Sequence, residues 1–248
     1  MTSPYDSFAW FYDRYWAAGI QEWQKPALEK LLFSSLPDGG TVLDLCCGAG
    51  HLAQVLSHRG YFVTGVDASE EMLRYARAKV PQAKFVLADA TDFVLQPQVD
   101  AAVCVFDSLN HLLQHDQLHH AFQNVYSSLK PGGCFVFDVN ASGAYGDRWN
   151  EQACEVHPDH AFFLRGGFDP QTRIAQTKVT MFRLLECWRR YDVEVRQRPW
   201  DVTETETMLR SSGFSDIDSY RASEDLGMTG HFGIGRVYFR AYRTTHSN

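Results

Sequence analysis

The sequence has no long apolar run, no basic cluster and no paired cysteine motif. No apolar stretch approaches the roughly 20 residues that a membrane-spanning helix needs, so we expect no membrane partner. Lys and Arg do not gather, and the net charge is −7, so we expect no nucleic-acid partner. The first residues lack the basic and apolar regions of a secretion signal. Six cysteines without a C-x-x-C pair suit a reducing, cytoplasmic location.

What the chain does contain is a core of ordinary size organised around one stretch, Val42–Ala53. With 248 residues, 45% of them hydrophobic, it can bury one domain, or one domain with an insertion. In this stretch an apolar run containing an acid leads into a glycine-bearing turn and then a helical pattern. The pattern predicts a buried parallel strand that enters a helix through a loop. Gly48 and Gly50 lack Cβ atoms, so we expect this loop to let a ligand approach the backbone.

Strands and helices alternate from there on. We expect strands at 41–46, 61–66, 84–88, 100–106 and 134–139, with helices at 50–59, 69–79 and 116–129. Repeated units of this kind predict a parallel sheet with helices on both faces. After a helix at 203–212, the last two strands, 216–221 and 236–243, are joined by a connection too short for a helical crossover. They should therefore pair as an antiparallel hairpin.

Two segments depart from this alternation. Residues 4–20 place aromatic side chains at spacings of three and four, which predicts an amphipathic helix, and a second helix should begin at Pro26. Residues 145–199 predict antiparallel strands at 161–165, 174–185 and 188–196, with a turn at 166–170. We therefore expect three parts: a helical cap, a core in two pieces and a β lid over the site, at 1–36, at 37–144 with 200–248, and at 145–199.

Acidic residues mark the expected binding edge of the sheet. Asp44, Asp67, Asp89 and Asp107 each lie at the carboxyl end of a predicted strand. In open α/β sheets, ligands bind at this edge. Four acids that converge there favour a ligand that carries positive charge.

Two kinds of site compete for the glycine loop. Gly48–Ala53 fits G-x-G-x-x-A, and Asp67 lies 19 residues beyond Gly48, which suits a dinucleotide such as NAD. The alternative is S-adenosylmethionine, which has no pyrophosphate but carries a sulfonium and an ammonium. Asp44, ahead of the glycines, would repel a pyrophosphate but suits a cation. The terminal hairpin also argues against the NAD-binding arrangement.

Five segments in order resemble the class I S-adenosylmethionine-dependent methyltransferases. They are Leu43–Gly50, Val66-Asp67, Ala88–Ala90, Phe106–Leu112 and Leu129–Gly133. The resemblance covers roughly residues 40–140 and 200–243, and the 107–112 segment and the insertion are similar to the small-molecule branch, such as glycine, sarcosine and amino-sugar N-methyltransferases. It implies an α/β, Rossmann-like seven-stranded sheet with strand seven antiparallel, helices on both faces and a small antiparallel β insertion after strand five.

The resemblance also implies roles for the cofactor-binding residues. Asp67 would accept both ribose hydroxyls, Asp89 would accept from the adenine amino group, and the Ala90 N–H would meet a ring nitrogen. Ala68 and Met72 would pack on the adenine. The methionyl part would lie on Gly48 and Gly50, with Asp44 at its ammonium and Phe106 near the sulfonium. The remaining cofactor candidates are Tyr12, Cys46 and Asp107.

The implied reaction is a direct displacement onto a nitrogen or oxygen of a small-molecule acceptor, and we favour nitrogen. His111 is the candidate general base, because its unperturbed pKa suits neutral pH. The acceptor candidates are Tyr5, Asn110, His111, Trp149, Tyr191 and Arg198. No metal is expected: His115 and His119 have the spacing of a ligand pair, but no third ligand accompanies them.

Two other functions stay open from the sequence. A methyltransferase-like chain can bind the cofactor and serve as a regulatory protein without turnover, and an NAD-dependent oxidoreductase is the less favoured alternative. The sequence sets neither the acceptor nor the oligomeric state.

Overall fold

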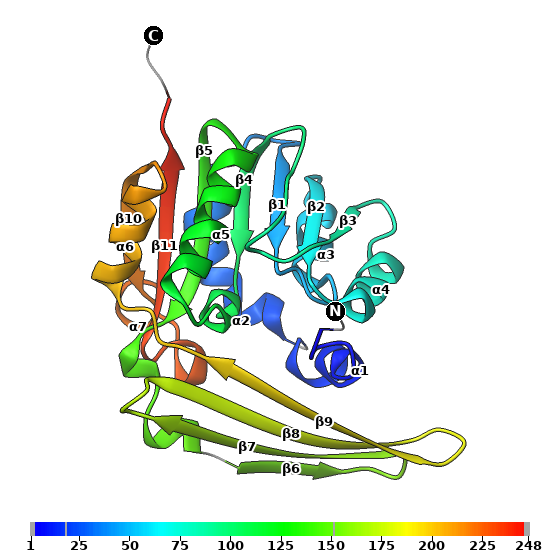
Figure 1. Ribbon diagram of the computed structural model, residues 1–248. Helices are drawn as coiled ribbons and strands as arrows, with labels where there is room; N and C mark the ends of the chain where they lie inside the picture. Colours follow the sequence, from blue (N-terminus) through cyan, green and yellow to red (C-terminus); the bar gives the residue numbers. More distant parts are fainter. Residues whose placement is uncertain (1–2, 18, 151, 246–248) are drawn as a thin grey trace.

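Two separate sheets make up the strand content of the described residues. The computed structural model describes residues 3–17, 19–150 and 152–245. A seven-stranded sheet has the order β10-β11-β5-β4-β1-β2-β3, and a four-stranded sheet has the order β6-β7-β8-β9. The small sheet lies across the carboxyl ends of the parallel strands of the large one (Figure 1). None of the described helices is both long and apolar enough to cross a membrane.

The large sheet confirms the predicted fold class. Its parallel strands are β1 (Thr41–Leu45), β2 (Phe62–Asp67), β3 (Lys84–Leu87), β4 (Val99–Cys104) and β5 (Leu129–Asn140). The last strand, β11 (Arg236–Arg243), runs antiparallel to β5 on one side and to β10 (Phe214–Arg221) on the other. The chain order reverses between β1 and β4, which are neighbours. This switch point is where ligands bind in open α/β sheets.

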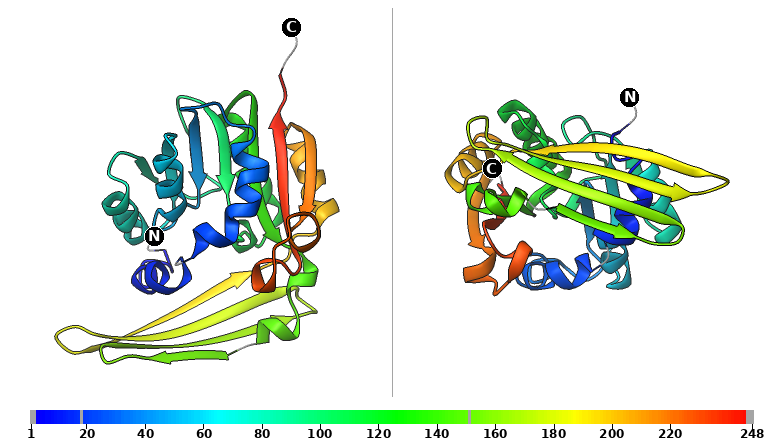
Figure 2. Two further views of the ribbon diagram at one scale, coloured as in Figure 1. Left: turned by 180° about the vertical axis from the view of Figure 1, so that it is seen from behind. Right: turned by 90° about the horizontal axis from the view of Figure 1, so that it is seen from below.

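Helices cover both faces of this sheet because its strands are apolar on both sides. In β1, Val42 packs toward one face and Leu43 toward the other. One face carries α5 (His115–Ser128) and α6 (Val202–Ser211), and the other carries α3 (His51–His58), the short α7 (Ala222–Asp225) and the end of the N-terminal helices (Figure 2). Next to α3 lies α4 (Glu70–Lys79).

The start of α4 is the predicted cap. The Ser69 side chain accepts a hydrogen bond from the Met72 N–H at 3.2 Å, and Glu70 and Glu71 occupy the first turn. Acids there interact favourably with the helix dipole. The cap ends the β2–α4 connection in a tight turn and so holds Asp67 at the edge of the sheet.

The N-terminal helices differ from the prediction. Residues 4–20 form a short helix, α1 (Ala9–Phe11), that continues as the wider η1 (Tyr12–Trp16). The second helix begins six residues before Pro26, as α2 (Ile20–Ala27) followed by η2 (Leu28–Phe33). Placing a helix start at Pro26 was therefore wrong. Gly19, with φ of +88°, turns the chain into α2, and Pro26 lies within the helix, where it has no N–H to donate.

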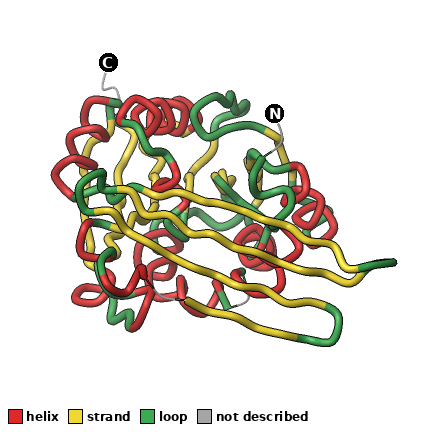
Figure 3. Tube along the Cα trace, turned by 60° about the horizontal axis from the view of Figure 1, so that its bottom comes forward, coloured by secondary structure: helices red, strands yellow, loops and turns green. Residues whose placement is uncertain are grey.

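The small sheet is larger than predicted. Its strands are β6 (Gln152–Val156), β7 (His160–Asp169), β8 (Ile174–Leu184) and β9 (Trp188–Gln197), all antiparallel (Figure 3). β6 escaped prediction because it is exposed along its whole length and shows no apolar alternation. The predicted turn at 166–170 was wrong: Gly166 pairs with Thr177 inside β7, and its missing Cβ makes room for the backbone carbonyl of Trp149.

The N-terminal segment is held against the inner face of the small sheet. Phe8 and Phe11 share an apolar cluster with Phe162, Val179 and Met181. Burial of large side chains of this kind is worth roughly 1.5–3 kcal/mol each. The two parts that cover the large sheet therefore support each other, and a space is left between them and the strand ends. Short 3-10 turns complete the chain: η3 (Ser108–His111), η4 (Ser142–Ala144), η5 (Asp147–Asn150) and η6 (Gly230–Phe232).

Gly50 provides a test of this packing. Its φ is +79°, and a Cβ there would lie 2.9 Å from the Cα of Ala76 in α4. We expect Gly50→Ala to lower the free energy of unfolding by about 1–3 kcal/mol, measured by urea denaturation. Gly39→Ala is the matched control, because its φ is +67° but no atom lies within 4 Å of the added Cβ. Equal losses in the two variants would show that the contact with α4 contributes nothing.

Candidate active site

A cavity of about 720 Å³ lies between the strand ends, the N-terminal segment and the small sheet. This volume is in the range of small-molecule sites. It is lined by predicted residues of both kinds, for cofactor and for acceptor: Tyr12, Cys46, Gly48, Asp67, Ala68, Met72, Asp89, Ala90, Phe106 and Asp107, and Tyr5, His111 and Trp149. The described lining does not include Asp44, Gly50, Asn110, Tyr191 or Arg198.

Asp67 is the best-oriented acid of the cavity. Its Oδ2 accepts from the Gly48 N–H at 2.8 Å and its Oδ1 from the Ser69 N–H at 2.9 Å. Each carboxylate oxygen keeps a second lone pair, so Asp67 can accept from two further donors at once. Burial raises the pKa of this carboxyl, and the backbone N–H bonds oppose that rise. Two neighbouring hydroxyls of a ligand would fit this carboxylate.

Asp89 is held in a turn at the end of β3. Its Oδ1 accepts from both the N–H and the hydroxyl of Thr91, at 2.8 and 2.6 Å. Both bonds go to the same oxygen, which fixes the direction of the carboxylate at the cavity wall. The arrangement suits an acceptor of a ligand amino group.

Asp44 lies behind the cavity rather than in its wall. It is 2% exposed, and its Oδ2 has no hydrogen-bond partner among the described residues. It borders a small pocket together with Tyr12, Cys46 and Phe106. Burial, and then the nearby charge of Asp67, raises the pKa of Asp44 to about 8. A buried acid without a partner is costly, and a cation beside it would relieve that cost.

The two glycines of the loop have different roles. Gly48 lines the cavity with φ of +52°, and a Cβ there would lie 3.3 Å from the ring of Tyr12. Gly50 was predicted to leave room for a ligand, but the room it leaves is taken by Ala76 of α4. Gly50 therefore permits the close approach of two helices.

Three non-glycine residues at the strand ends have left-handed backbone conformations. They are Cys46, Phe106 and Asp107, with φ of +56°, +68° and +50°. Such conformations cost about 1–3 kcal/mol each and persist only where the surroundings enforce them. All three line the cavity, at the ends of β1 and β4. The tight turns bring their side chains to the switch point of the sheet.

His111 is the centre of a polar cluster in the cavity wall. Its Nδ1 lies 2.9 Å from the Arg196 carbonyl, and its Nε2 lies 3.0 Å from the Tyr5 hydroxyl and 3.2 Å from the Gln197 Nε2. A carbonyl can only accept, so Nδ1 carries the proton and Nε2 of the neutral ring accepts. Burial lowers the pKa of His111, although Asp107 opposes that effect. The ring is therefore neutral at pH 7, with a lone pair on Nε2.

An ion pair that the sequence analysis missed lies beside this cluster. Arg236, at the start of β11, is 4% exposed and donates to Asp107 at 2.6 Å and to Asp138. Asp138 is fully buried, and burial raises its pKa to about 6 against the effect of Arg236. An acid inside the apolar run 134–139 was the available signal for a buried charge.

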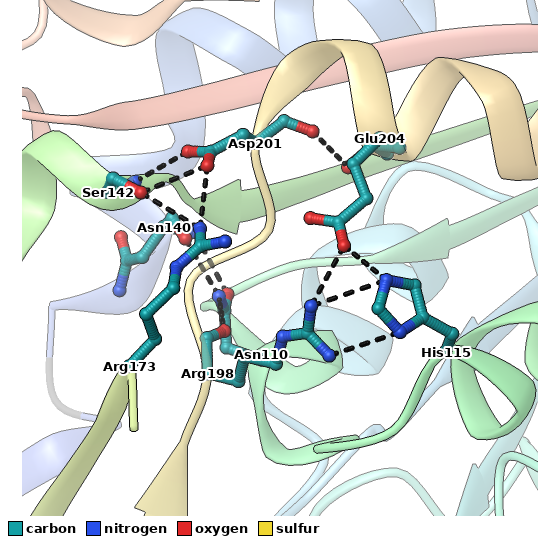
Figure 4. A network of polar contacts seen from close by, with 9 residues as sticks. Asn110, His115, Asn140, Ser142, Arg173, Arg198, Asp201 and Glu204 are labelled. Atoms are coloured by element: carbon teal, nitrogen blue, oxygen red, sulfur yellow. Dashed lines mark hydrogen bonds and ion pairs between the residues drawn. The ribbon is translucent and has the colours of Figure 1, made fainter. Parts of the chain in front are cut away.

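Asn110 is placed in the scaffold, not in the cavity wall. It is fully buried, donates to the carbonyls of Asn140 and Arg198 at 2.8 and 2.7 Å, and accepts from the Asn140 N–H at 2.9 Å (Figure 4). These three bonds join η3 to β5 and to the segment after β9. The structure therefore contradicts the prediction of an acceptor contact, because the amide is already occupied.

Arg198 and Tyr191 also fall outside the cavity wall. Arg198 donates to Glu204 at 2.9 Å and lies 3.3 Å from His115 (Figure 4). Its guanidinium also stacks on Trp200, 4.1 Å from the ring centre. Its charge is already paired, so it is not available for an acceptor carboxylate. Tyr191 packs with the apolar cluster between the small sheet and the N-terminal segment.

Comparison with known proteins shows the family. The family model of the methyltransferase domain matches residues 42–133. A putative methyltransferase of Bacillus subtilis, YqeM, is 31% identical over 217 residues, which cover 85% of this chain and 86% of that protein. An amino-sugar N,N-dimethyltransferase of Streptomyces venezuelae, named for dTDP-3-amino-3,4,6-trideoxy-α-D-glucopyranose, is 33% identical over 109 residues, or 44% of this chain and 46% of that one.

A solved structure gives the same result for the fold. A methyltransferase from Clostridium acetobutylicum superposes with a TM-score of 0.79 at 23% identity, over 98% of this chain and all of that one. The seven-stranded sheet with its antiparallel last strand and the acids at the strand ends agree with this relationship. The chain belongs to the class I S-adenosylmethionine-dependent methyltransferases.

Proposed function

We propose that this enzyme transfers a methyl group from S-adenosylmethionine to a nitrogen of a small-molecule acceptor by direct displacement. The observation that carries the proposal is one cavity whose wall brings together the acids Asp67 and Asp89 and the neutral imidazole of His111. The named activity of the amino-sugar relative, an N,N-dimethyltransferase, supports an amine acceptor.

The acids Asp67, Asp89 and Asp44 fit the cofactor. Asp67 has free lone pairs on both oxygens for the two ribose hydroxyls, and Asp89, fixed by Thr91 at the cavity wall, would accept from the adenine amino group. The Oδ2 of Asp44, which no described residue contacts by a hydrogen bond, suits the ammonium of the methionyl part, directly or through water. Tyr12, which lies over Gly48, would close this part of the site.

Bound S-adenosylmethionine supplies a methyl group on a sulfonium, which a lone pair can displace with loss of a neutral thioether. The task of the chain is to hold a nucleophile in line with that methyl group, and such positioning is worth roughly 7–11 kcal/mol. It must also keep the nucleophile unprotonated. Phe106, which follows β4, lines both the cavity and the small pocket that Asp44 borders.

His111 is the candidate catalytic base. An acceptor N–H that replaced the Tyr5 hydroxyl at Nε2 would pass its proton to that nitrogen as the new bond to carbon forms. The Arg196 carbonyl keeps the proton on Nδ1 and would stabilise the imidazolium that results. Tyr5, whose pKa burial raises, stays a neutral phenol.

The cap and the small sheet act, in this proposal, as the cover of the site. The predicted division into a cap at 1–36, a core and a β lid at 145–199 assigns the cavity roof to the two outer parts. Phe8 and Trp16 come from the first of these, and Leu164, Val179 and Val195 from the second. Apolar side chains there exclude water from the reacting atoms.

Removal of the Asp67 carboxylate tests the cofactor site. Hydrogen bonds to a charged group are worth about 1.5–3 kcal/mol each, so loss of two should weaken binding of S-adenosylhomocysteine at least about 100-fold. Calorimetric titration of wild type, Asp67→Ala and the exposed-turn control Asp38→Ala measures this, with NAD as a second ligand. Binding of NAD instead would support the oxidoreductase. Tight binding without turnover on any acceptor would support a regulatory protein.

The raised pKa of Asp44 predicts a pH-dependent affinity. In the free protein Asp44 is protonated below about pH 8, and a ligand ammonium beside it favours the ionised form. Binding should therefore release a proton, and affinity for S-adenosylhomocysteine should rise from pH 6 to 7.5, by up to about tenfold per unit. Titration in buffers of different ionisation enthalpy counts the protons. If Asp44→Asn keeps the same slope, another group is responsible.

His111 should titrate below its ordinary range and carry catalysis. We expect the His111 ring to show a pKa below 6.5 in a proton NMR titration, assigned with His111→Asn, because burial disfavours the charged ring. The same variant should lower kcat by about 10²–10⁴-fold and leave S-adenosylhomocysteine affinity unchanged. His58→Asn, on the exposed end of α3, serves as the control. A pKa above 6.5 would contradict the neutral base.

A further inference from the structure

The charges around the cavity are strongly unequal. Acids in its described wall are Asp67, Asp89 and Asp107, and the single cation among the described side chains of the wall is Arg236. Both terminal nitrogens of Arg236 are engaged, one by Asp107 and the other by Asp138. The described part of the wall therefore offers no unpaired cation to a ligand carboxylate or phosphate.

The polar cluster around His111 can still accept hydrogen bonds from a ligand, but the amide donors of Gln197 are already used. Gln197 accepts at Oε1 from the Tyr145 hydroxyl at 3.1 Å, and its Nε2 lies 2.6 Å from Asp107 and 3.2 Å from His111. Both amide hydrogens are thus used. The one lone pair of His111 Nε2 already accepts, so what the cluster still offers to a ligand is lone pairs on Asp107 and on the Tyr5 oxygen. A ligand that meets them must donate.

The wall that the small sheet and η6 contribute is largely apolar. The small sheet contributes Leu164, Val179 and Val195 from its inner face, and η6 contributes Phe232. In Figure 3 the strands of this sheet run across the strand ends of the large one. A polar or charged body would lose hydration against these side chains without gaining partners.

We propose that the acceptor is an amine on an apolar body that carries no carboxylate or phosphate near the amine, and that Asp107, fixed by Gln197 and Arg236, selects it. Asp107 is here a specificity-determining residue: its two oxygens each keep a lone pair for the amine hydrogens. This inference rests on the proposed function and narrows its acceptor class. It distinguishes acceptors by charge, which the family membership does not.

A matched set of ligands tests the charge preference. The protein is first loaded with S-adenosylhomocysteine and then titrated with 2-phenylethylamine, 2-phenylethanol, phenylalanine and 3-phenylpropionate, which share one ring and differ in charge. We expect 2-phenylethylamine to bind at least tenfold more tightly than either carboxylate. Equal binding of phenylalanine or 3-phenylpropionate, or no binding of the amine at millimolar concentration, would overturn the inference. Failure of S-adenosylhomocysteine itself to bind would instead reject the proposed function.

Two variants link the preference to the residues. Asp107→Asn removes the negative charge and frees one terminal nitrogen of Arg236. It should therefore weaken the binding of 2-phenylethylamine at least tenfold and strengthen the binding of 3-phenylpropionate. Thr177→Lys adds a cation to the face of β8 that lines the cavity and should also strengthen the binding of 3-phenylpropionate. Thr180→Lys, on the opposite face of the same strand, is the matched control. Circular dichroism and a thermal melt report whether each variant is folded. If Thr177→Lys and Thr180→Lys act alike, the cavity does not select by charge.

Discussion

The constraint on which the site depends is the burial of several carboxylates at one edge of a sheet. Asp44 is almost fully enclosed, one of its oxygens has no partner in the part of the chain that the structure describes, and Asp67 adds a second charge close to it. Burying an acid costs several kcal/mol unless a proton or a counter-charge accompanies it. In the free protein the proton supplies this, as the raised pKa of Asp44 shows. A cationic ligand can replace this proton. The free-energy cost of burying Asp44 therefore makes the site selective for positively charged ligands.

The N-terminal segment contacts both the turn that holds Asp67 and the ring of His111. Asp6 accepts from the Ser69 hydroxyl at 2.7 Å, beside the Asp67 turn, and Asp13 lies between His51 and Lys79, at 2.8 and 2.6 Å. Tyr5, one residue before Asp6, reaches His111. One short segment therefore contacts both the Asp67 turn, which we propose binds the ribose, and the candidate base.

The sequence was sufficient where local patterns decide the structure and insufficient where distant segments meet. The core strands, the Ser69 cap and the wall position of Asp67 follow from apolar runs, cap chemistry and the rule for strand ends. Nothing local marks Gln197 or Arg236, whose partners lie 90 and 129 residues away along the chain. Asn110 was misassigned for the same reason: a buried amide that joins three backbone groups looks, in sequence, like one that awaits a ligand.

The candidate base is assembled from three parts of the chain, and this has a consequence for when it can act. The core supplies the His111 ring, β9 supplies the Arg196 carbonyl that fixes the proton on Nδ1, and the N-terminal segment supplies the hydroxyl at Nε2. If either covering part moves away, the ring loses its tautomer or its orientation. The groups that orient the base thus belong to the same segments that exclude water. A base that is fully oriented only in the closed site would take its proton from the bound acceptor and not from water. Proton transfer during displacement by an amine depends on such an arrangement.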